Sequence, residues 1–262
     1  NSVPGTFHTP QSNFGIYHES NISLTDQLRL TLGLRYDHQH VKIDYDTEAH
    51  FRLACDAQMM GRPVKFDSRY VSQFLSSTSE DYDQLLPKFA LSYQFNSYGN
   101  VYAVVSKGFR AGGYNLQMFS DIFQTEQRSL GAKMAALMKG DMTVEHTEAD
   151  YDNVNSTISY KPEESWNYEA GLHLNLFGGR LHADLAAFYM RIQNQQLSVL
   201  AGNYGYGRMM VNAGRSASSG IELSLRGSAF DDRLTWSASY GFTNSNFRNY
   251  TDSVASRTTD GK

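Results

Sequence analysis

Apolar and polar residues alternate with a period of two along much of the chain, most regularly over residues 164–248. In the clearest stretch, one parity holds Leu234, Trp236, Ala238, Tyr240 and Phe242, and the other holds Thr235, Ser237, Ser239, Gly241 and Thr243. Successive side chains of a β-strand point to opposite faces, so the pattern predicts a sheet with one apolar face and one wet face. This is the pattern of a transmembrane β-barrel wall, with lipid outside and a polar lumen inside.

The alternation predicts about eight long antiparallel strands of an up-and-down barrel. They span 12–22, 28–44, 83–96, 101–112, 164–177, 180–197, 211–229 and a final strand from Leu234 to about 248. Pro87 removes one backbone donor from the third strand, so we expect it near a strand end or at a bulge.

The connections between these strands alternate between short turns and longer segments. Two of them, near 46–80 and 113–161, read as long polar loops, and a moderate loop covers 198–210. Outer-membrane barrels have this asymmetry, with tight periplasmic turns and long extracellular loops. The second long loop should hold one short helix, because apolar residues recur there at helical spacing before a glycine. These residues are Leu130, Met134, Leu137, Met138 and Gly140.

Composition narrows the class of protein further. Charged residues make up 19% of the 262 residues, and no apolar run approaches the roughly 18 residues that one membrane helix needs. The net charge of −4 gives no basic footprint for nucleic acid. Cys55 is the only cysteine, which excludes an internal disulfide, and we interpret it as an incidental thiol in a loop. The termini read as those of a single incomplete domain, 1–262, cut from a larger chain.

Four segments, in order, resemble motifs of the TonB-dependent outer-membrane receptors. Residues 102–115 (YAVVSKGFRAGGYN) resemble the strand written YASYSKGFRPGGFN in that family. Residues 164–171 (ESWNYEAG) resemble ETxNYELG, and residues 177–181 (FGGRL) resemble the LFDGRL turn. Asn212-Ala213-Gly214 with Gly220-Ile221-Glu222 resembles NAGxAxxxGxE.

The resemblance implies a section of a 22-stranded barrel with a plugged lumen in the outer membrane of a Gram-negative bacterium. It implies uptake of a scarce nutrient such as an iron–siderophore, haem, cobalamin or a glycan, energised through TonB. The implied partners are outer-membrane lipid, the plug domain of the same full-length chain, TonB through its N-terminal region, and the small nutrient. This stretch holds no plug domain, TonB box or C-terminal strand that ends in an aromatic residue.

Two sets of residues are candidates for contact with a ligand or the plug. An extracellular vestibule that stacks on a planar or sugar ligand is predicted from Arg110, Tyr114, Tyr204, Tyr206 and Arg208. The polar parity of the strands predicts a lumen-facing set made of Arg29, Arg35, Asp37, Glu169, Asp184, Glu222 and Arg226. Lys107 and Arg110 lie at the end of the fourth strand and allow two interpretations. They contact an anionic ligand or the plug, or they are charged residues at a barrel rim where glycines allow the strand to bend.

Catalytic and metal sites are not predicted, and neither is a cofactor. Carboxylates are plentiful, but no nucleophile and base stand at a useful spacing, and a wet lumen shifts pKa values little. His38 and His40 share one face and could bind a metal with Asp44 or His50, although plain surface histidines explain them better. The pairs Met59-Met60 and Met209-Met210 are better explained by packing than by capture of a soft metal.

Two other classes of protein fit parts of the pattern. Eight strands allow a complete small barrel with a structural or adhesion role. Such a barrel, however, encloses only enough space for its own side chains, and the inward set here is long and charged. An outer-membrane enzyme is disfavoured because the sequence lacks a catalytic constellation.

Overall fold

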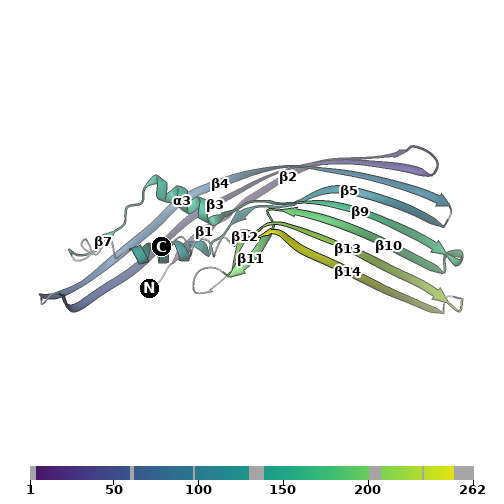
Figure 1. Cartoon of the computed structure of the whole chain (residues 1–262). Helices are drawn as coiled ribbons and strands as arrows, with labels where there is room; N and C mark the ends of the chain where they lie inside the picture. Colours follow the sequence, from purple (N-terminus) through teal and green to yellow (C-terminus); the bar gives the residue numbers. More distant parts are fainter. Residues whose placement is uncertain are drawn as a thin grey trace.

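One open, curved, antiparallel sheet dominates the computed structural model (Figure 1). The structure describes residues 4–59, 62–96, 98–129, 139–200, 208–231 and 233–250. The long strands are β2 (Gln11–Ser23), β3 (Leu28–Met59), β4 (Arg62–Asn96), β5 (Gly99–Arg110), β9 (Glu163–Leu176), β10 (Leu181–Gln193), β13 (Gly214–Ala229) and β14 (Leu234–Tyr250). They pair in chain order, with β2 and β14 at the two edges of the sheet, which confirms the up-and-down topology.

Strand register confirms the predicted faces. One row of neighbours crosses the sheet through Leu30, Leu91, Ala103, Ala170, Ala187, Ile221 and Phe242. The next row of the opposite parity crosses through Arg29, Ser92, Tyr102, Gly171, Ala186, Glu222 and Gly241. Because every strand keeps its parity against its neighbours, the sheet has one continuous apolar face and one continuous polar face. We call one region of this sheet the wall. It extends from the short turns to the row that contains Tyr36 and Leu85.

The hairpin of β3 and β4 corrects one prediction. Residues 46–80 do not form a loop, because both strands continue far beyond the wall and stay paired as far as Met59 and Arg62. Cys55 therefore lies on a strand. In this extension the apolar parity inverts: Leu34 and Tyr36 are on the apolar face of the wall, whereas Val41, Ile43 and Tyr45 have the other parity and are buried.

The inversion has a simple physical cause. Inside a membrane the outer face of a barrel must be apolar, but above the membrane that same face meets water, while the inner face can pack against other segments. One unbroken strand can therefore serve both environments if its apolar residues change parity at the boundary. The sequence carries this signal, yet the abundance of Ser, Asp and Arg over residues 46–80 predicts a loop there, and that prediction is wrong.

A second layer, which we call the cap, packs on the inner face of this extension. It contains helix α1 (Met118–Ser129), helix α3 (Glu148–Ile158), and the paired strands β11 (Gln196–Leu200) and β12 (Arg208–Asn212). Three short strands join it: β6 (Gly113–Tyr114) pairs with β8 (Ser159–Tyr160), and β7 (Met142–Thr143) pairs with β4. A further strand, β1 (Gly5–His8), extends the β3 edge.

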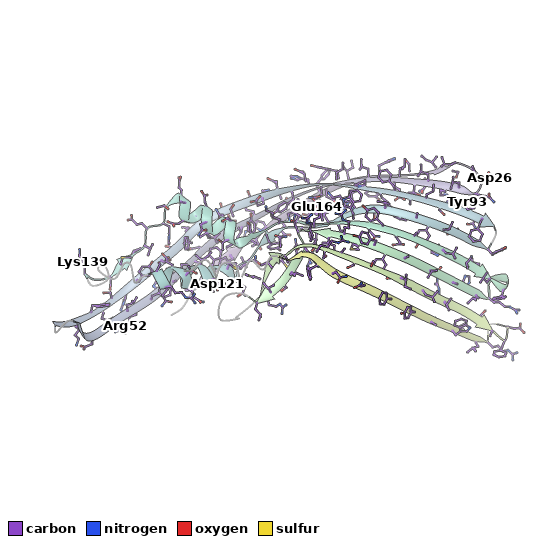
Figure 2. All side chains as sticks on the ribbon, viewed as in Figure 1. Asp26, Arg52, Tyr93, Asp121, Lys139 and Glu164 are labelled. Carbon is purple, nitrogen blue, oxygen red and sulfur yellow. The ribbon has the colours of Figure 1, made fainter. Side chains whose placement is uncertain are left out.

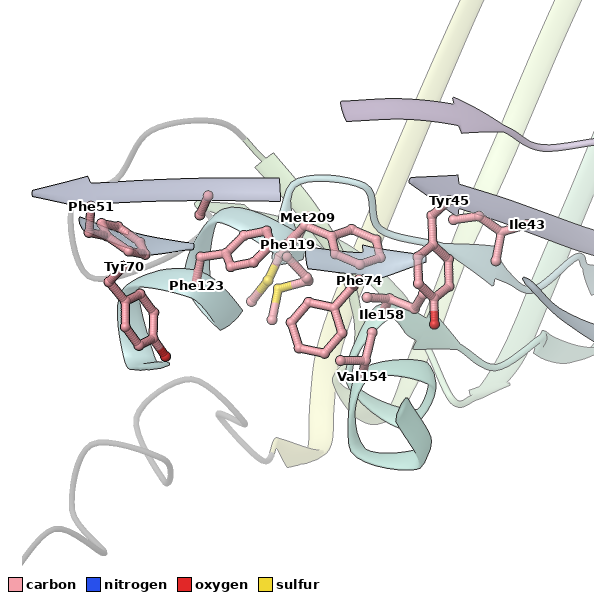
Figure 3. Packing of buried hydrophobic residues seen from close by; sticks show 12 residues of the cluster. Ile43, Tyr45, Phe51, Tyr70, Phe74, Phe119, Phe123, Val154, Ile158 and Met209 are labelled. Carbon is pink, nitrogen blue, oxygen red and sulfur yellow. The ribbon is translucent and has the colours of Figure 1, made fainter. Parts of the chain in front are cut away.

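Aromatic side chains form the core of the cap (Figure 3). Phe119 and Phe123 of α1 are buried, and their rings lie 4.9 Å from Tyr45 and 5.5 Å from Phe74, respectively. Val154 and Ile158 bring α3 into the same cluster, and the Tyr45 hydroxyl donates to Asn155 Oδ1 at 3.0 Å. The cluster holds Ile43, Tyr45, Ala49, Phe51, Tyr70, Phe74, Met118, Phe119, Phe123, Val154, Ile158 and Met209.

The predicted loop helix falls outside the described residues at Leu130, Met134, Leu137 and Met138. The two observed helices flank that segment. A capping box begins α3, in which Asp150 N donates to Thr147 Oγ1 and Thr147 N donates to Asp150 Oδ2. Neither helix of the described chain is long and apolar enough to cross a membrane.

Candidate functional site

The polar face of the wall carries a hydrogen-bonded network over β5, β9, β10 and β13. Asp184 accepts from Arg226 at 2.9 Å and lies 2.7 Å from His173 Nδ1. The ring of Tyr102 stacks on His173 with centroids 5.0 Å apart, and its hydroxyl donates to Glu169 at 2.8 Å. The predicted lumen-facing residues of this half of the sheet therefore lie together on one face.

The remaining residues of the predicted lumen-facing set lie on the same polar face. On β3, Arg35 Nε donates to Asp37 Oδ2 at 2.7 Å. Arg29 and Glu222 belong to one cross-sheet row, and neither forms an ion pair within the part of the chain that the structure describes. Whether these groups contact a ligand or a plug stays a prediction.

Gly171 gives Tyr102 its place in the network. A Cβ built on Gly171 would collide with the Tyr102 ring, so a larger residue there would push the ring away from His173. The glycine of the WNYEAG motif is thus explained by the close approach of a neighbouring side chain.

At the rim, where the wall meets the cap, Gln196 ties three segments together. Its side-chain amide donates to Ala111 O at 2.7 Å and to Lys161 O at 3.1 Å, and its backbone N–H donates to Glu163 at 2.6 Å. Only 6% of Gln196 is exposed. This contact fixes the β11–β12 pair beside the end of β5.

Two asparagines fasten the same rim, and the residue pattern predicts a role for neither of them. Asn115 exchanges two hydrogen bonds with the backbone of Met210, at 2.8 and 2.7 Å. Asn212 exchanges two with the backbone of Lys161, at 2.9 and 2.7 Å. Each asparagine lies in one of the motifs quoted above, so a search for polar residues in otherwise structural motifs could have found them.

The predicted vestibule residues lie on neighbouring segments without forming one cluster. Arg110 is exposed at the end of β5, and Arg208 is bound to Ser198 across the β11–β12 pair at 2.9 Å. Tyr114 is partly buried on β6, and burial raises its pKa to about 12. Where the chain is described, no hydrogen bond or ion pair joins these three side chains, and Tyr204 and Tyr206 fall outside the described residues.

Other candidates from the sequence are held in pairs. Lys107 Nζ lies 3.0 Å from Glu164 at the rim. His38 and His40 lie 2.9 and 2.8 Å from Asp83 and Asp81, each directly across the β3–β4 ladder. Over the described ranges, no group of three or more histidine, cysteine or carboxylate side chains is arranged to hold a metal ion. Met209 is buried in the cap core, which confirms packing for that methionine.

One serine–histidine pair occurs inside the cap. Ser72 Oγ lies 2.9 Å from His146 Nε2 and donates to Glu126 Oε2 at 2.6 Å. A hydroxyl group has one proton, and Ser72 donates this proton in its hydrogen bond to Glu126. The imidazole of His146 must therefore donate to the serine oxygen and cannot act as the base that deprotonates it. Ser72 is also fully buried, so it is not available as a nucleophile. We interpret these contacts as structural links between β4, α1 and the segment before α3.

Comparisons with known proteins agree on one family and fold. A family model described as TonB dependent receptor-like, beta-barrel, matches residues 2–262. The structure resembles the ferric yersiniabactin uptake receptor FyuA from Yersinia pestis, with a TM-score of 0.56 and 18% identity over 96% of this chain and 29% of that one.

Two further solved structures give the same TM-score of 0.56. They are the siderophore receptor PiuA from Acinetobacter baumannii, 17% identical over 93% of this chain and 27% of that one, and the copper transporter OprC, 16% identical over 94% and 30%. The chain therefore spans less than a third of the length of these proteins, and at such identities the likeness shows the fold alone.

Proposed function

Because this chain belongs to the TonB-dependent receptor family, in its β-barrel part, we propose that it forms a section of an outer-membrane receptor that takes up a scarce nutrient. The apolar face of the wall contacts outer-membrane lipid, and the polar face lines the lumen. The plug domain of the same full-length chain fills that lumen, and TonB supplies energy through a part of the receptor outside this stretch.

The continuity of the polar face carries this proposal. Polar residues of one parity extend from Arg29 and Ser92 near the short turns to Asp37 and Gln84 at the rim. Above the rim, the same face turns towards the cap. A ligand bound under the cap would therefore meet a polar route along the inside of the wall, as a transport barrel requires.

For the nutrient we propose the ferric siderophore class. Arg110 is exposed at the rim, and Arg208 lies on the β12 strand, which Asn115 binds through Met210. Guanidinium groups form charge-assisted hydrogen bonds with anionic oxygen ligands, and anionic iron chelates present such oxygens. The similar structures FyuA and PiuA are themselves a ferric yersiniabactin receptor and a siderophore receptor.

A radio-iron uptake assay with the full-length receptor tests this proposal. Cells that lack the receptor should lose uptake of at least one ferric siderophore under iron limitation, and the wild-type gene should restore it. In binding assays, Arg110→Ala should weaken the affinity for that siderophore about tenfold, which corresponds to about 1.4 kcal/mol.

Arg233→Ala provides the matched control, because Arg233 is also exposed but lies in the β13–β14 turn, at the opposite end of the wall. It should leave the affinity unchanged. The siderophore class would be wrong if the receptor deletion left iron uptake unchanged and the receptor showed saturable binding of haem, cobalamin or an oligosaccharide. The nutrient would then belong to the class that binds.

A further inference from the structure

A groove opens at the rim between β4 and the start of β9. Its volume is about 400 Å³, within the range of about 300–1,000 Å³ that is common for ligand sites. It is lined by residues 80–84 of β4, by residues 159–162, and by Glu164 and Asn194. Figure 2 shows Glu164 midway along the sheet, far from the turn that carries Asp26.

One wall of this groove is a free strand edge. The β4–β5 ladder ends at Lys88, and β4 meets β7 only at Tyr70 and Val71. Between them, residues 72–87 of β4 pair with β3 alone among the parts of the chain described. Pro87, which lacks a backbone N–H, stands where the second ladder stops, as its chemistry requires. An unpaired edge is a template for the addition of another strand.

Carboxylates flank this edge on both faces of β4. Glu80 has the inward parity, Asp81 and Asp83 have the outward parity, and Glu164 faces them from β9. Asp81 and Asp83 have histidine partners, Glu164 has Lys107, and Lys161 also lines the groove. Four carboxylates and one lysine line the groove, so it favours a cationic occupant.

Tyr82, in the middle of this edge, is directly opposite Gln39 of β3 on the inward face. Burial, with Glu80 nearby, raises the pKa of Tyr82 to about 12, so this phenol adds no charge at neutral pH.

We propose that residues 80–84 of β4 are a docking edge for an extended basic peptide, which adds to the sheet as a further strand and sets its lysine or arginine side chains against the flanking carboxylates. Five residues of strand present an edge of roughly 17 Å, at about 3.4 Å per residue. Main-chain hydrogen bonds supply the affinity and alternate side chains supply the selectivity. This role lies outside nutrient uptake and does not depend on it.

Other occupants fit the site less well. An anionic lipid headgroup would meet an excess of negative charge. A metal ion would need a ligand group, and none occurs among the residues that the structure describes. A free amine would satisfy the charge but would leave the strand edge unpaired.

The test uses the full-length receptor in detergent and a fluorescent peptide of alternating lysine and threonine. The peptide should bind, its affinity should fall as salt rises, and bound peptide should slow amide hydrogen exchange in residues 80–84. The same peptide with N-methyl groups on alternate residues keeps its charge but cannot form the ladder. It should bind at least tenfold more weakly.

Glu80→Gln should weaken the unmodified peptide severalfold, whereas Asp26→Asn at the far turn should have no effect. Equal binding of the N-methylated peptide, or protection that is absent from residues 80–84, would overturn strand addition. Binding of anionic lipid vesicles in place of the peptide would overturn the choice of partner.

Discussion

Replacing Leu223 with arginine should block assembly of the receptor in the outer membrane. Leu223 lies midway along β13 on the apolar face, between Leu185 and Tyr240. An arginine that faces lipid at the membrane midplane destabilises the membrane-inserted barrel by about 2–4 kcal/mol. Heat-modifiable migration on gels and protease protection of the membrane fraction would report the loss of assembled receptor.

Glu222→Gln is the matched control, because Glu222 is the preceding residue and has the opposite parity. This substitution removes one charge from the polar face and should leave assembly unchanged. If Leu223→Arg and Glu222→Gln proved equally harmless, the faces of the sheet would be assigned wrongly.

Replacing Phe74 with alanine should destabilise the cap without preventing assembly of the wall. Phe74 is 3% exposed, and its ring lies 5.5 Å from Phe123, 3.9 Å from His146 and 5.7 Å from Tyr151. Removal of a buried phenylalanine leaves a cavity and costs about 3–5 kcal/mol. Hydrogen exchange in α1 and α3 should accelerate strongly, while gel migration of the folded barrel should stay normal.

The neighbouring residue supplies the control for this experiment. Leu75 is 61% exposed on the opposite face of the same strand, so Leu75→Ala should change the stability of the cap by no more than about 0.5 kcal/mol. Comparable acceleration in both variants would show that the extension of β3 and β4 does not bury its inner face as described.

The sequence was sufficient to predict the wall. Alternation alone assigns a face to residues such as Leu30 and Arg29, because a strand has only two faces and a shift of one residue would exchange them. Each ladder confirms that assignment. The short turns likewise follow from local chemistry, as at Gly178, whose φ of 67° favours glycine.

The cap could not be predicted in the same way, because its contacts join residues far apart in the chain. Asn115 and Met210 are separated by 95 positions, and Tyr45 and Asn155 by 110. No periodic pattern carries such pairings. The extension of β3, by contrast, was open to prediction: its apolar residues change parity between Tyr36 and Val41. We interpret that change as the membrane boundary.

Accessibility of spin labels along β3 is the most direct test of the account as a whole. Single cysteines would be introduced from Leu30 to Phe51 in a Cys55→Ser background of the full-length receptor in lipid bilayers. Contact with oxygen, which concentrates in lipid, should peak at even positions up to Tyr36. From residue 38 onward, even positions should instead contact a water-soluble relaxation agent, and odd positions such as Ile43 and Tyr45 should be shielded from both. In this account the membrane wall ends at Tyr36, and β3 continues above it as an extension covered by the cap. Lipid contact at even positions beyond residue 40, or no alternation at all, would contradict that arrangement.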